Sequence, residues 1–288
     1  MSTTPPARTD RELDVVLVGA SGFVGQLTAA HLAAEAGSAR IALAGRSTAR
    51  LTAVRDELGA AAADWPIIEV DAHDSDGLRA LAARTRVVAT TVGPYHKLGM
   101  PLAAACALRG THYADLTGEV LFVRRCADML HEEARRSGAR IVNSCGFDSV
   151  PSDLAVLLTA TAALEAHDGG LTDATLYVRK LRAGFSGGTV DSARQQAIAM
   201  AEDPWAKKVL TDPYALSADR DHEPRRRTRS GSGSGSGAAS GSSVGAVLGA
   251  LTRSAKVARS MVPVSRDASD GHWYGPFVMA PFNTRLVR

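Results

Sequence analysis

The segment Asp14–Gly25, in which an apolar strand-like run ends in three regularly spaced glycines, constrains this chain most. Gly19 permits a sharp turn, Gly22 lets a phosphate approach the backbone, and Gly25 lets a helix pack closely on the strand. The following residues, 27–36, have the pattern of a helix, whose start offers N–H groups and a positive dipole end to an anion. This strand–turn–helix order predicts a dinucleotide-binding loop, with a merely structural glycine turn as the alternative.

The residues after the second predicted strand indicate which dinucleotide binds. A site for NAD usually places an acidic residue there, on the ribose 2′-hydroxyl. In this chain the strand 40–45 is followed by Arg46 and Ser47. A guanidinium group can hold a 2′-phosphate by charge-assisted hydrogen bonds, and a hydroxyl can add another. The sequence therefore favours NADP(H), with a solvated surface arginine as the alternative.

Composition excludes several classes of protein. A net charge of +3 over 288 residues does not indicate nucleic-acid binding. Cys106, Cys126 and Cys145 are widely spaced without a CxxC motif, so we expect neither a metal site nor a disulfide framework. We expect Cys145, which precedes a predicted helix, to be a small buried residue, with a stabilised thiolate as the alternative. The polar N-terminus lacks the apolar core of a signal peptide, and no run of about 18 apolar residues predicts a transmembrane helix.

The first half of the chain alternates between strand-like and helix-like segments. Such alternation predicts right-handed βαβ units and a parallel sheet with helices on both faces. We therefore expect an α/β fold, with a flexible N-terminus at 1–12 and a Rossmann-type doubly wound domain at 13–165. The later strands of that domain are predicted at 66–71, 86–92, 111–116 and 140–144, and the later helices at 49–58, 75–84, 98–109, 119–137 and 151–163.

The pattern changes in the second half, where we expect a smaller α+β domain at 166–288. Alternating residues predict a strand at 175–183, and a helix follows at 189–201. The Gly-, Ser- and Arg-rich stretch 217–243 is predicted to be a mobile linker. The segment 244–262 has the pattern of a basic amphipathic helix, which either covers the second domain's sheet or lies on an anionic membrane surface.

Ligands of a doubly wound sheet gather at the carboxyl ends of its strands, and this edge supplies the site candidates. Asp71 is predicted to lie near the adenine, with a surface turn residue as the alternative. The proton donors that we consider are Tyr95, His96 and Tyr113, each of which has a hydrogen-bonded loop residue as its alternative interpretation. The complete predicted cofactor set is Gly19, Ser21, Gly22, Phe23, Val24, Gly25, Arg46, Ser47, Asp71, Val92, Gly93 and Pro94.

Four segments together resemble a known family: Val92–Tyr95, Thr111–Glu119, Asn143–Asp153 and Ser186–Thr189. They are similar to the saccharopine dehydrogenase-like oxidoreductases, and most similar to the mycobacterial trans-acting enoyl reductase group. The resemblance implies a Rossmann domain that binds NADP and an α+β domain that covers the nicotinamide. It also implies reduction of an enoyl group on an acyl or lipid substrate carried by a polyketide synthase, during glycolipid assembly.

Members of this family continue beyond the position of Arg288, so we expect a C-terminally truncated chain with an incomplete α+β domain. We expect such a chain to bind NADP(H) but to reduce enoyl substrates slowly. Two other functions stay open: a non-catalytic NADP-binding protein that docks on a lipid surface or a synthase, and a saccharopine-type amine dehydrogenase. The expected location is the cytoplasm, with peripheral contact at the inner face of the plasma membrane through 244–262.

Overall fold

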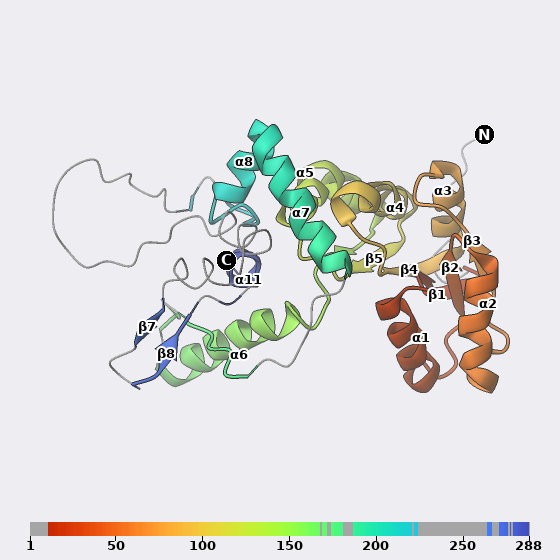
Figure 1. Cartoon of the computed structure of the whole chain (residues 1–288), viewed down its shortest axis with the longest axis horizontal. Helices are drawn as coiled ribbons and strands as arrows, with labels where there is room; N and C mark the ends of the chain where they lie inside the picture. The colour runs from red at the N-terminus through yellow and green to blue at the C-terminus, as the bar shows by residue number, and fades with distance from the viewer. Residues whose placement is uncertain are drawn as a thin grey trace, which may run out of the picture. The chain divides into compact units, whose positions relative to one another are not determined.

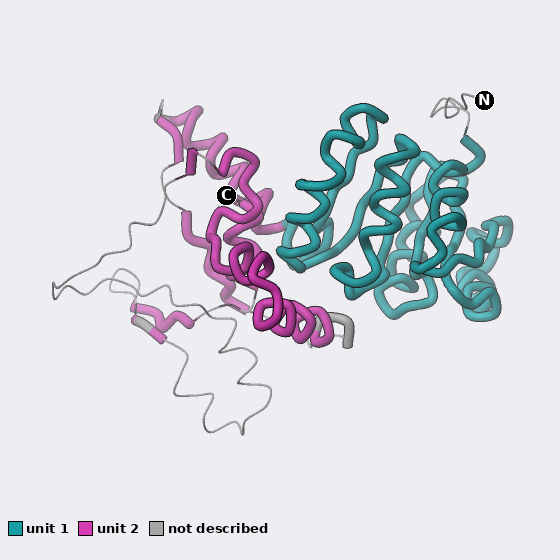
Figure 2. Tube along the Cα trace, turned by 90° about the horizontal axis from the view of Figure 1, so that it is seen from above, with its two compact units in different colours: residues 1–150 teal, residues 151–288 magenta. Residues whose placement is uncertain are grey.

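The computed structural model describes residues 11–167, 169–171, 174–180, 187–220, 222–223, 264–266, 271–275, 277 and 279–287. The chain divides into two compact units, residues 1–150 and residues 151–288, which Figure 2 colours teal and magenta. The domain boundary that we expected at 165 lies inside the first helix of the second unit, α6 (Val150–His167).

The first unit is built on a six-stranded parallel sheet in the order β3-β2-β1-β4-β5-β6 (Figure 1). Strand order therefore reverses between β1 and β4, and that reversal opens a crevice at the carboxyl ends of these two strands. The predicted Rossmann-type doubly wound sheet is confirmed. Its strands are β1 (Leu13–Val18), β2 (Ile41–Gly45), β3 (Ile67–Glu69), β4 (Thr85–Thr90), β5 (His112–Asp115) and β6 (Ile141–Val142).

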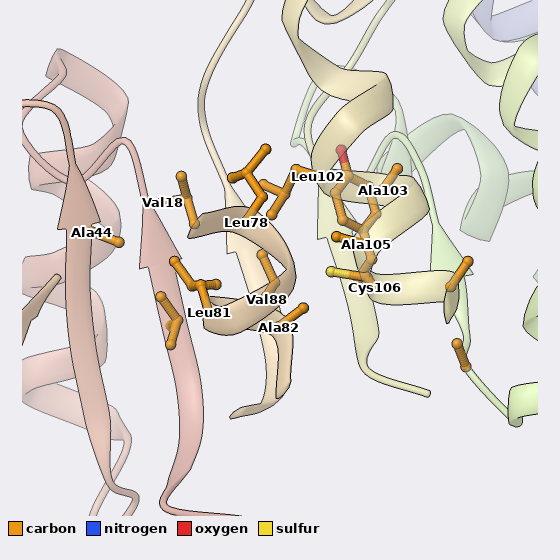
Figure 3. Packing of buried hydrophobic residues seen from close by; sticks show 14 of the residues in the cluster. Val18, Ala44, Leu78, Leu81, Ala82, Val88, Leu102, Ala103, Ala105 and Cys106 are labelled. Carbon is orange, nitrogen blue, oxygen red and sulfur yellow. The ribbon is translucent and has the colours of Figure 1, made fainter. Parts of the chain in front are cut away.

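Successive residues of the strands point to opposite faces of the sheet and fill two separate cores. Leu17 and Leu43 belong to the core under α1 and α2, which cover one face. Val18, Ala44 and Val88 belong to the core under α3, α4 and α5, and Figure 3 shows side chains of α3 and α4 packed against these strand residues. The helices of this unit are α1 (Phe23–Glu35), α2 (Thr48–Glu57), the short 3-10 helix η2 (Gly59–Ala62), α3 (Ser75–Arg84), α4 (Tyr95–Arg109) and α5 (Val120–Ser137).

The second unit contains helices and a two-stranded antiparallel ribbon formed by β7 (Ser265–Arg266) and β8 (Trp273–Tyr274). Its other described helices are α7 (Gly187–Glu202), α8 (Pro204–Thr211) and α11 (Ala280–Leu286), and α7 confirms the predicted helix at 189–201. Arg285 ties α11 to the end of α8, because its guanidinium donates to the carbonyl oxygens of Leu210 and Asp212 at 2.8 and 3.0 Å.

The predicted strand at 175–183 is wrong for the residues that the structure describes there, since 174–180 are exposed and contain no strand. Alternation of apolar and polar residues shows only that a segment could form a strand. A strand also needs a neighbouring strand to pair with, and this neighbour must come from elsewhere in the fold. In the predicted linker, the Ser217 hydroxyl donates to Glu223 at 2.6 Å. Residues 224–243 and the segment 244–262 lie outside the described residues. Of the helices that are described, none combines the length and hydropathy that a membrane crossing requires.

Candidate functional site

The loops after β1 and β4 meet at the strand-order reversal and are fixed by backbone hydrogen bonds. The amide of Gly19 donates to the carbonyl oxygen of Ala44 on β2 at 2.8 Å, and that of Thr91 donates to Val18 on β1 at 3.0 Å. The Thr91 hydroxyl also donates to the carbonyl oxygen of Gly19 at 3.2 Å. Three strands thus hold the glycine-rich loop in one conformation at the edge where ligands of this fold bind.

The three glycines of the loop meet different neighbours. Gly19 has a φ of +89°, which disfavours other residues, and a Cβ added there would lie 2.7 Å from a methyl group of Val92. A Cβ on Gly25 would overlap the carbonyl oxygen of Gly19 and the backbone of Ala20. A Cβ on Gly22, by contrast, would come no closer than 3.4 Å to another protein atom. The protein itself requires Gly19 and Gly25, whereas the space beside Gly22 is open to a ligand.

The start of α1 has the properties of an anion-binding site. Its N-cap, Gly22, has no side chain to accept the free backbone N–H groups, and its first turn carries no acidic residue. The next two helices are capped by their own side chains: Ser47 accepts from Arg50 N in α2, and Asp74 accepts from Gly77 N in α3. The α1 start therefore keeps donors for a phosphate group. Among the other predicted loop residues, Phe23 is exposed, while Ser21 and Val24 are partly buried.

A basic site lies beside this loop at the end of β2. Arg46 is exposed and has neither an ion pair nor a hydrogen bond with any described residue, while Ser47 serves as the α2 N-cap. A further arginine, Arg50 in the first turn of α2, donates to the carbonyl oxygen of Ser21 at 3.2 Å. Sequence reasoning missed Arg50, although its position four residues after Arg46 was a usable signal.

Asp71, the predicted adenine neighbour, closes a turn. Its carboxylate accepts from the amide of His73 at 2.8 Å, and its carbonyl oxygen accepts from the amide of Asp74 at 3.0 Å. A carboxylate that accepts the amide two residues later forms an Asx turn, which is a common local role for aspartate. The structure thus supplies the turn contact that the alternative interpretation of Asp71 requires.

The predicted nicotinamide-side residues Val92, Gly93 and Pro94 connect β4 to α4. The amide of Val92 donates to the Thr90 hydroxyl at 3.2 Å, and the Gly93–Pro94 peptide bond is cis. Gly93 is exposed, and a Cβ there would lie 3.6 Å from the ring of Tyr95, an ordinary contact. This loop therefore exposes backbone at Gly93, while the Val92 side chain faces Gly19 of the glycine-rich loop.

A buried carboxylate determines where α4 begins. Glu119, which is 1% exposed, accepts from the amides of Tyr95 and His96 at 2.9 and 2.7 Å. These contacts explain why α4 starts at Tyr95, three residues before the predicted start, because they satisfy two N–H groups that a helix start leaves free. Unlike α1, α4 offers these two donors to the protein and not to a ligand. Sequence reasoning could not find this contact, because Glu119 lies more than twenty residues from both partners.

The three predicted proton donors occupy different surroundings. Tyr95 is 5% exposed, and its hydroxyl donates to the carbonyl oxygen of Thr90 at 3.1 Å. Tyr113 is 1% exposed and belongs to the core. Burial raises the pKa of both phenols above the ordinary value, which weakens them as acids. His96 is only partly buried, and its Nδ1 lies 3.5 Å from a guanidinium nitrogen of Arg125. The two tyrosines therefore belong to the core, and of the three side chains only that of His96 is partly open to solvent.

A second buried carboxylate organises the ends of β5 and β6. Asp115 accepts from the amides of Thr117 and Ser144 at 3.0 and 2.9 Å, and from the side-chain amide of Asn143 at 2.7 Å. Burial nevertheless raises the pKa of Asp115. The prediction that Cys145 is buried is wrong, because β6 ends at Val142 and the turn through Ser144 brings the thiol to the surface. Partial desolvation raises the pKa of that thiol, which also disfavours the thiolate alternative.

Comparisons with known proteins concern the cofactor and the family of similar chains. Residues 15–142 match the family model of the saccharopine dehydrogenase NADP binding domain, which supports NADP(H) as the cofactor. A Mycobacterium tuberculosis protein, Rv2449c, whose name assigns it provisionally to the trans-acting enoyl reductases, is 47% identical over 97% of this chain. A Mycobacterium leprae protein named trans-acting enoyl reductase is 45% identical over 96% of it. The chain spans 61% of the length of each of these relatives.

A solved structure is also similar to part of the chain. Apo saccharopine dehydrogenase (L-Glu forming) from Saccharomyces cerevisiae is 21% identical in the matched region, with a TM-score of 0.45. The match covers 54% of this chain and 32% of the yeast protein.

Proposed function

We propose that the chain is an NADP(H)-dependent oxidoreductase, since residues 15–142 match the family model of the saccharopine dehydrogenase NADP binding domain. The observation that carries the proposal is the pairing of two features at one sheet edge. The α1 start is uncapped beside the open space at Gly22, and Arg46 has no partner among the described residues. A pyrophosphate fits the first feature, and a 2′-phosphate fits the second.

The residues at this edge have separate roles in holding the cofactor. The loop Gly19–Gly25 binds the pyrophosphate through backbone N–H groups, and Arg46 with Ser47 binds the 2′-phosphate. The backbone of Val92–Pro94 lies next to the nicotinamide half. When bound, NADPH supplies a hydride to the substrate. The fixed hydrogen bonds of these loops orient the cofactor, so that binding needs little rearrangement of the protein.

The names of the relatives suggest the reaction. We propose that the hydride reduces the double bond of an enoyl group on an acyl or lipid-type substrate, which a synthase partner presents in trans. Hydride addition at one carbon leaves an electron pair at the neighbouring carbon, and that carbon takes up a proton. The proposal includes peripheral contact with a membrane through 244–262, which lie outside the described residues.

His96 fits the role of proton donor better than either tyrosine. Histidine is a common general acid near neutral pH, and this side chain is reachable from solvent, whereas both tyrosine hydroxyls are buried. Its Nδ1 lies 3.5 Å from a guanidinium nitrogen of Arg125. As a general acid, the ring starts as the imidazolium and becomes a neutral imidazole when its proton passes to the substrate. Glu119 fixes the backbone of His96 at the start of α4.

The proposal is tested first by cofactor binding and then by turnover. Fluorescence titration of the purified chain should give a lower Kd for NADPH than for NADH. Incubation with a long-chain trans-enoyl thioester should then oxidise NADPH slowly, and saccharopine with NADP⁺ should give no reduction. The Gly22→Val variant is the control for background oxidation. Tight NADPH binding without turnover of the thioester would favour the non-catalytic role, and turnover of saccharopine would favour the amine dehydrogenase.

The proton donor is tested by two substitutions in neighbouring residues. His96→Gln should lower kcat about a hundredfold, the smaller end of the usual effect of general acid catalysis, and leave the Kd for NADPH unchanged. Tyr95→Phe should keep most of kcat and instead lower the unfolding midpoint, because it removes the contact with Thr90. The reverse pattern would assign the proton to Tyr95.

A further inference from the structure

Arg50 connects two parts of the site that the sequence separates by 29 residues. It occupies the first turn of α2, where its own amide donates to the Ser47 hydroxyl at 3.4 Å. Its guanidinium reaches across to the glycine-rich loop and donates to the carbonyl oxygen of Ser21 at 3.2 Å. The side chain is exposed, so its remaining N–H groups face solvent at the entrance to the site.

The charges around the end of β2 indicate that one arginine is insufficient for an anion. Glu69 pairs with Gly45 in the β2–β3 register, directly beside Arg46, and accepts from the Thr48 hydroxyl at 2.7 Å. A carboxylate at this position repels a phosphate and offsets the charge of Arg46. A second guanidinium makes the local charge positive again, and Arg50 stands at the same helix start, whose dipole adds to the effect.

We propose that Arg50 is a second determinant of the choice of NADP(H) over NAD(H), which shares the 2′-phosphate with Arg46 while it holds the glycine-rich loop. The proposal rests on the proposed function, because it concerns the same cofactor site. Arg46 approaches from the end of β2 and Arg50 from the first turn of α2, so the two guanidinium groups can contact different oxygens of one phosphate. The bond to Ser21 fixes the Arg50 side chain before the cofactor arrives, which reduces the entropy lost on binding.

A purely structural role for Arg50 makes a different prediction. A side chain that only braces the Ser21 loop would affect the pyrophosphate site, which NADPH and NADH use equally. A side chain that binds the 2′-phosphate affects only the ligands that carry it. The ratio of the two affinities therefore separates the roles, whatever the substitution does to stability.

The test uses Arg50→Gln, Arg50→Lys and the matched control Arg55→Gln, which removes an arginine from the same helix where it pairs with Asp56. Each variant is titrated with NADPH, NADH, 2′,5′-ADP and 5′-AMP. Arg50→Gln should raise the Kd for NADPH and 2′,5′-ADP about tenfold, which is the effect of losing one hydrogen bond to a charged group. It should change the Kd for NADH and 5′-AMP less than about twofold. Arg50→Lys should recover part of the loss, because it restores charge without the planar fork. Arg55→Gln should match the wild type.

Two results would overturn the proposal. Equal losses for NADPH and NADH in Arg50→Gln would show that the residue only braces the loop, and unchanged affinities would show that it does neither. Failure of the wild-type chain to bind any of the four ligands would instead reject the proposed function, so the two failures are distinguishable. Thermal unfolding of each variant shows whether a loss of binding reflects loss of the fold.

Discussion

The two edges of the six-stranded sheet use charge in opposite ways. At the amino edge the arginines have partners: the buried guanidinium of Arg11 donates to the carbonyl oxygens of Ala82, Thr85 and Arg109. The exposed ion pairs at that edge are Glu12–Arg84, Asp14–Arg40 and Asp14–Arg86. At the carboxyl edge, Arg46 has no partner among the described residues and α1 has no side-chain cap.

This difference separates residues that stabilise the fold from residues whose hydrogen-bonding groups are available to a ligand. Paired charges exchange hydrogen bonds with water for hydrogen bonds with each other. Removal of one partner should therefore change the stability of the fold and leave cofactor binding unchanged. Unpaired donors at a helix start gain a partner only when an anion arrives, so their removal should change binding and not stability. The starts of α1 and α4 show the same contrast within the carboxyl edge. Glu119 accepts from backbone N–H groups at the start of α4, whereas no side chain caps α1.

The largest expected effect is on cofactor binding, in Gly22→Val. The new Cβ would lie 3.4 Å from the carbonyl oxygen of Gly19, its nearest protein atom, so the unfolding midpoint should stay close to that of the wild type. The side chain would occupy the space of the pyrophosphate, so NADPH affinity should fall more than about a hundredfold. Titration and thermal unfolding measure the two quantities. Gly25→Ala is the matched control: its Cβ overlaps Gly19 and should lower the midpoint. Unchanged NADPH affinity in a folded Gly22→Val protein would contradict the anion site.

The second prediction concerns the amino edge. Arg11→Leu should destabilise the protein by about 3 kcal/mol, because buried carbonyl oxygens lose a charged donor. Urea unfolding measures this effect. The NADPH affinity of the folded variant should equal that of the wild type, since Arg11 lies at the edge remote from the glycine-rich loop. A loss of affinity without a loss of stability would contradict the division of labour between the edges.

The third prediction returns to the carboxyl edge. Arg46→Ala should weaken NADPH about tenfold or more and leave NADH nearly unchanged, because a charge-assisted contact with the 2′-phosphate is worth about 1.5 kcal/mol or more. Stability should not change, since Arg46 has no described partner to lose. Equal losses for both cofactors in a titration would rule out selection by this residue.

Local sequence pattern predicted the first unit well. The order of strand-like and helix-like segments predicted the sheet and helices around the glycine-rich loop, and α3 was predicted at its observed bounds, Ser75–Arg84. The preference for NADP(H) was predicted from the residues directly after β2, where Arg46 stands and no acidic residue is beside it. These features depend on residues that are close in the sequence, and their physical causes act over a few positions.

The parts of the site that sequence reasoning missed depend on contacts between distant residues. Arg50 meets Ser21, and Glu119 meets the start of α4, only after the sheet has formed. The strand predicted at 175–183 is wrong over its described residues for the same reason, because its pattern was compatible with a sheet but 174–180 have no strand pairing among the described residues. Cys145 was expected to be a small buried residue, but β6 ends at Val142 and the thiol is exposed.

The smallest expected effect is the acid dependence of the ion pairs at the amino edge. Hydrogen bonds from Arg40 lower the pKa of Asp14 well below its ordinary value of 3.8, and Arg86 adds to the shift. A carboxyl group whose pKa is lower in the folded state stabilises the fold above its unfolded pKa, and this contribution disappears as the pH falls through the folded pKa. Because these pairs are solvent-exposed, the contribution should be at most about 1 kcal/mol and should shrink in high salt.

Asp14→Asn should therefore unfold at a lower temperature than the wild type near neutral pH, and the two midpoints should approach each other below about pH 4. The matched control is Asp76→Asn, which removes a 90% exposed carboxylate paired with Arg79 and should differ little from the wild type at either pH. NADPH affinity should be the same in Asp14→Asn and the wild type near neutral pH, because Asp14 lies at the start of β1, on the amino edge. A pH-independent gap between Asp14→Asn and the wild type would show that the lost contacts stabilise the fold by packing, and that paired charge is not what distinguishes this edge.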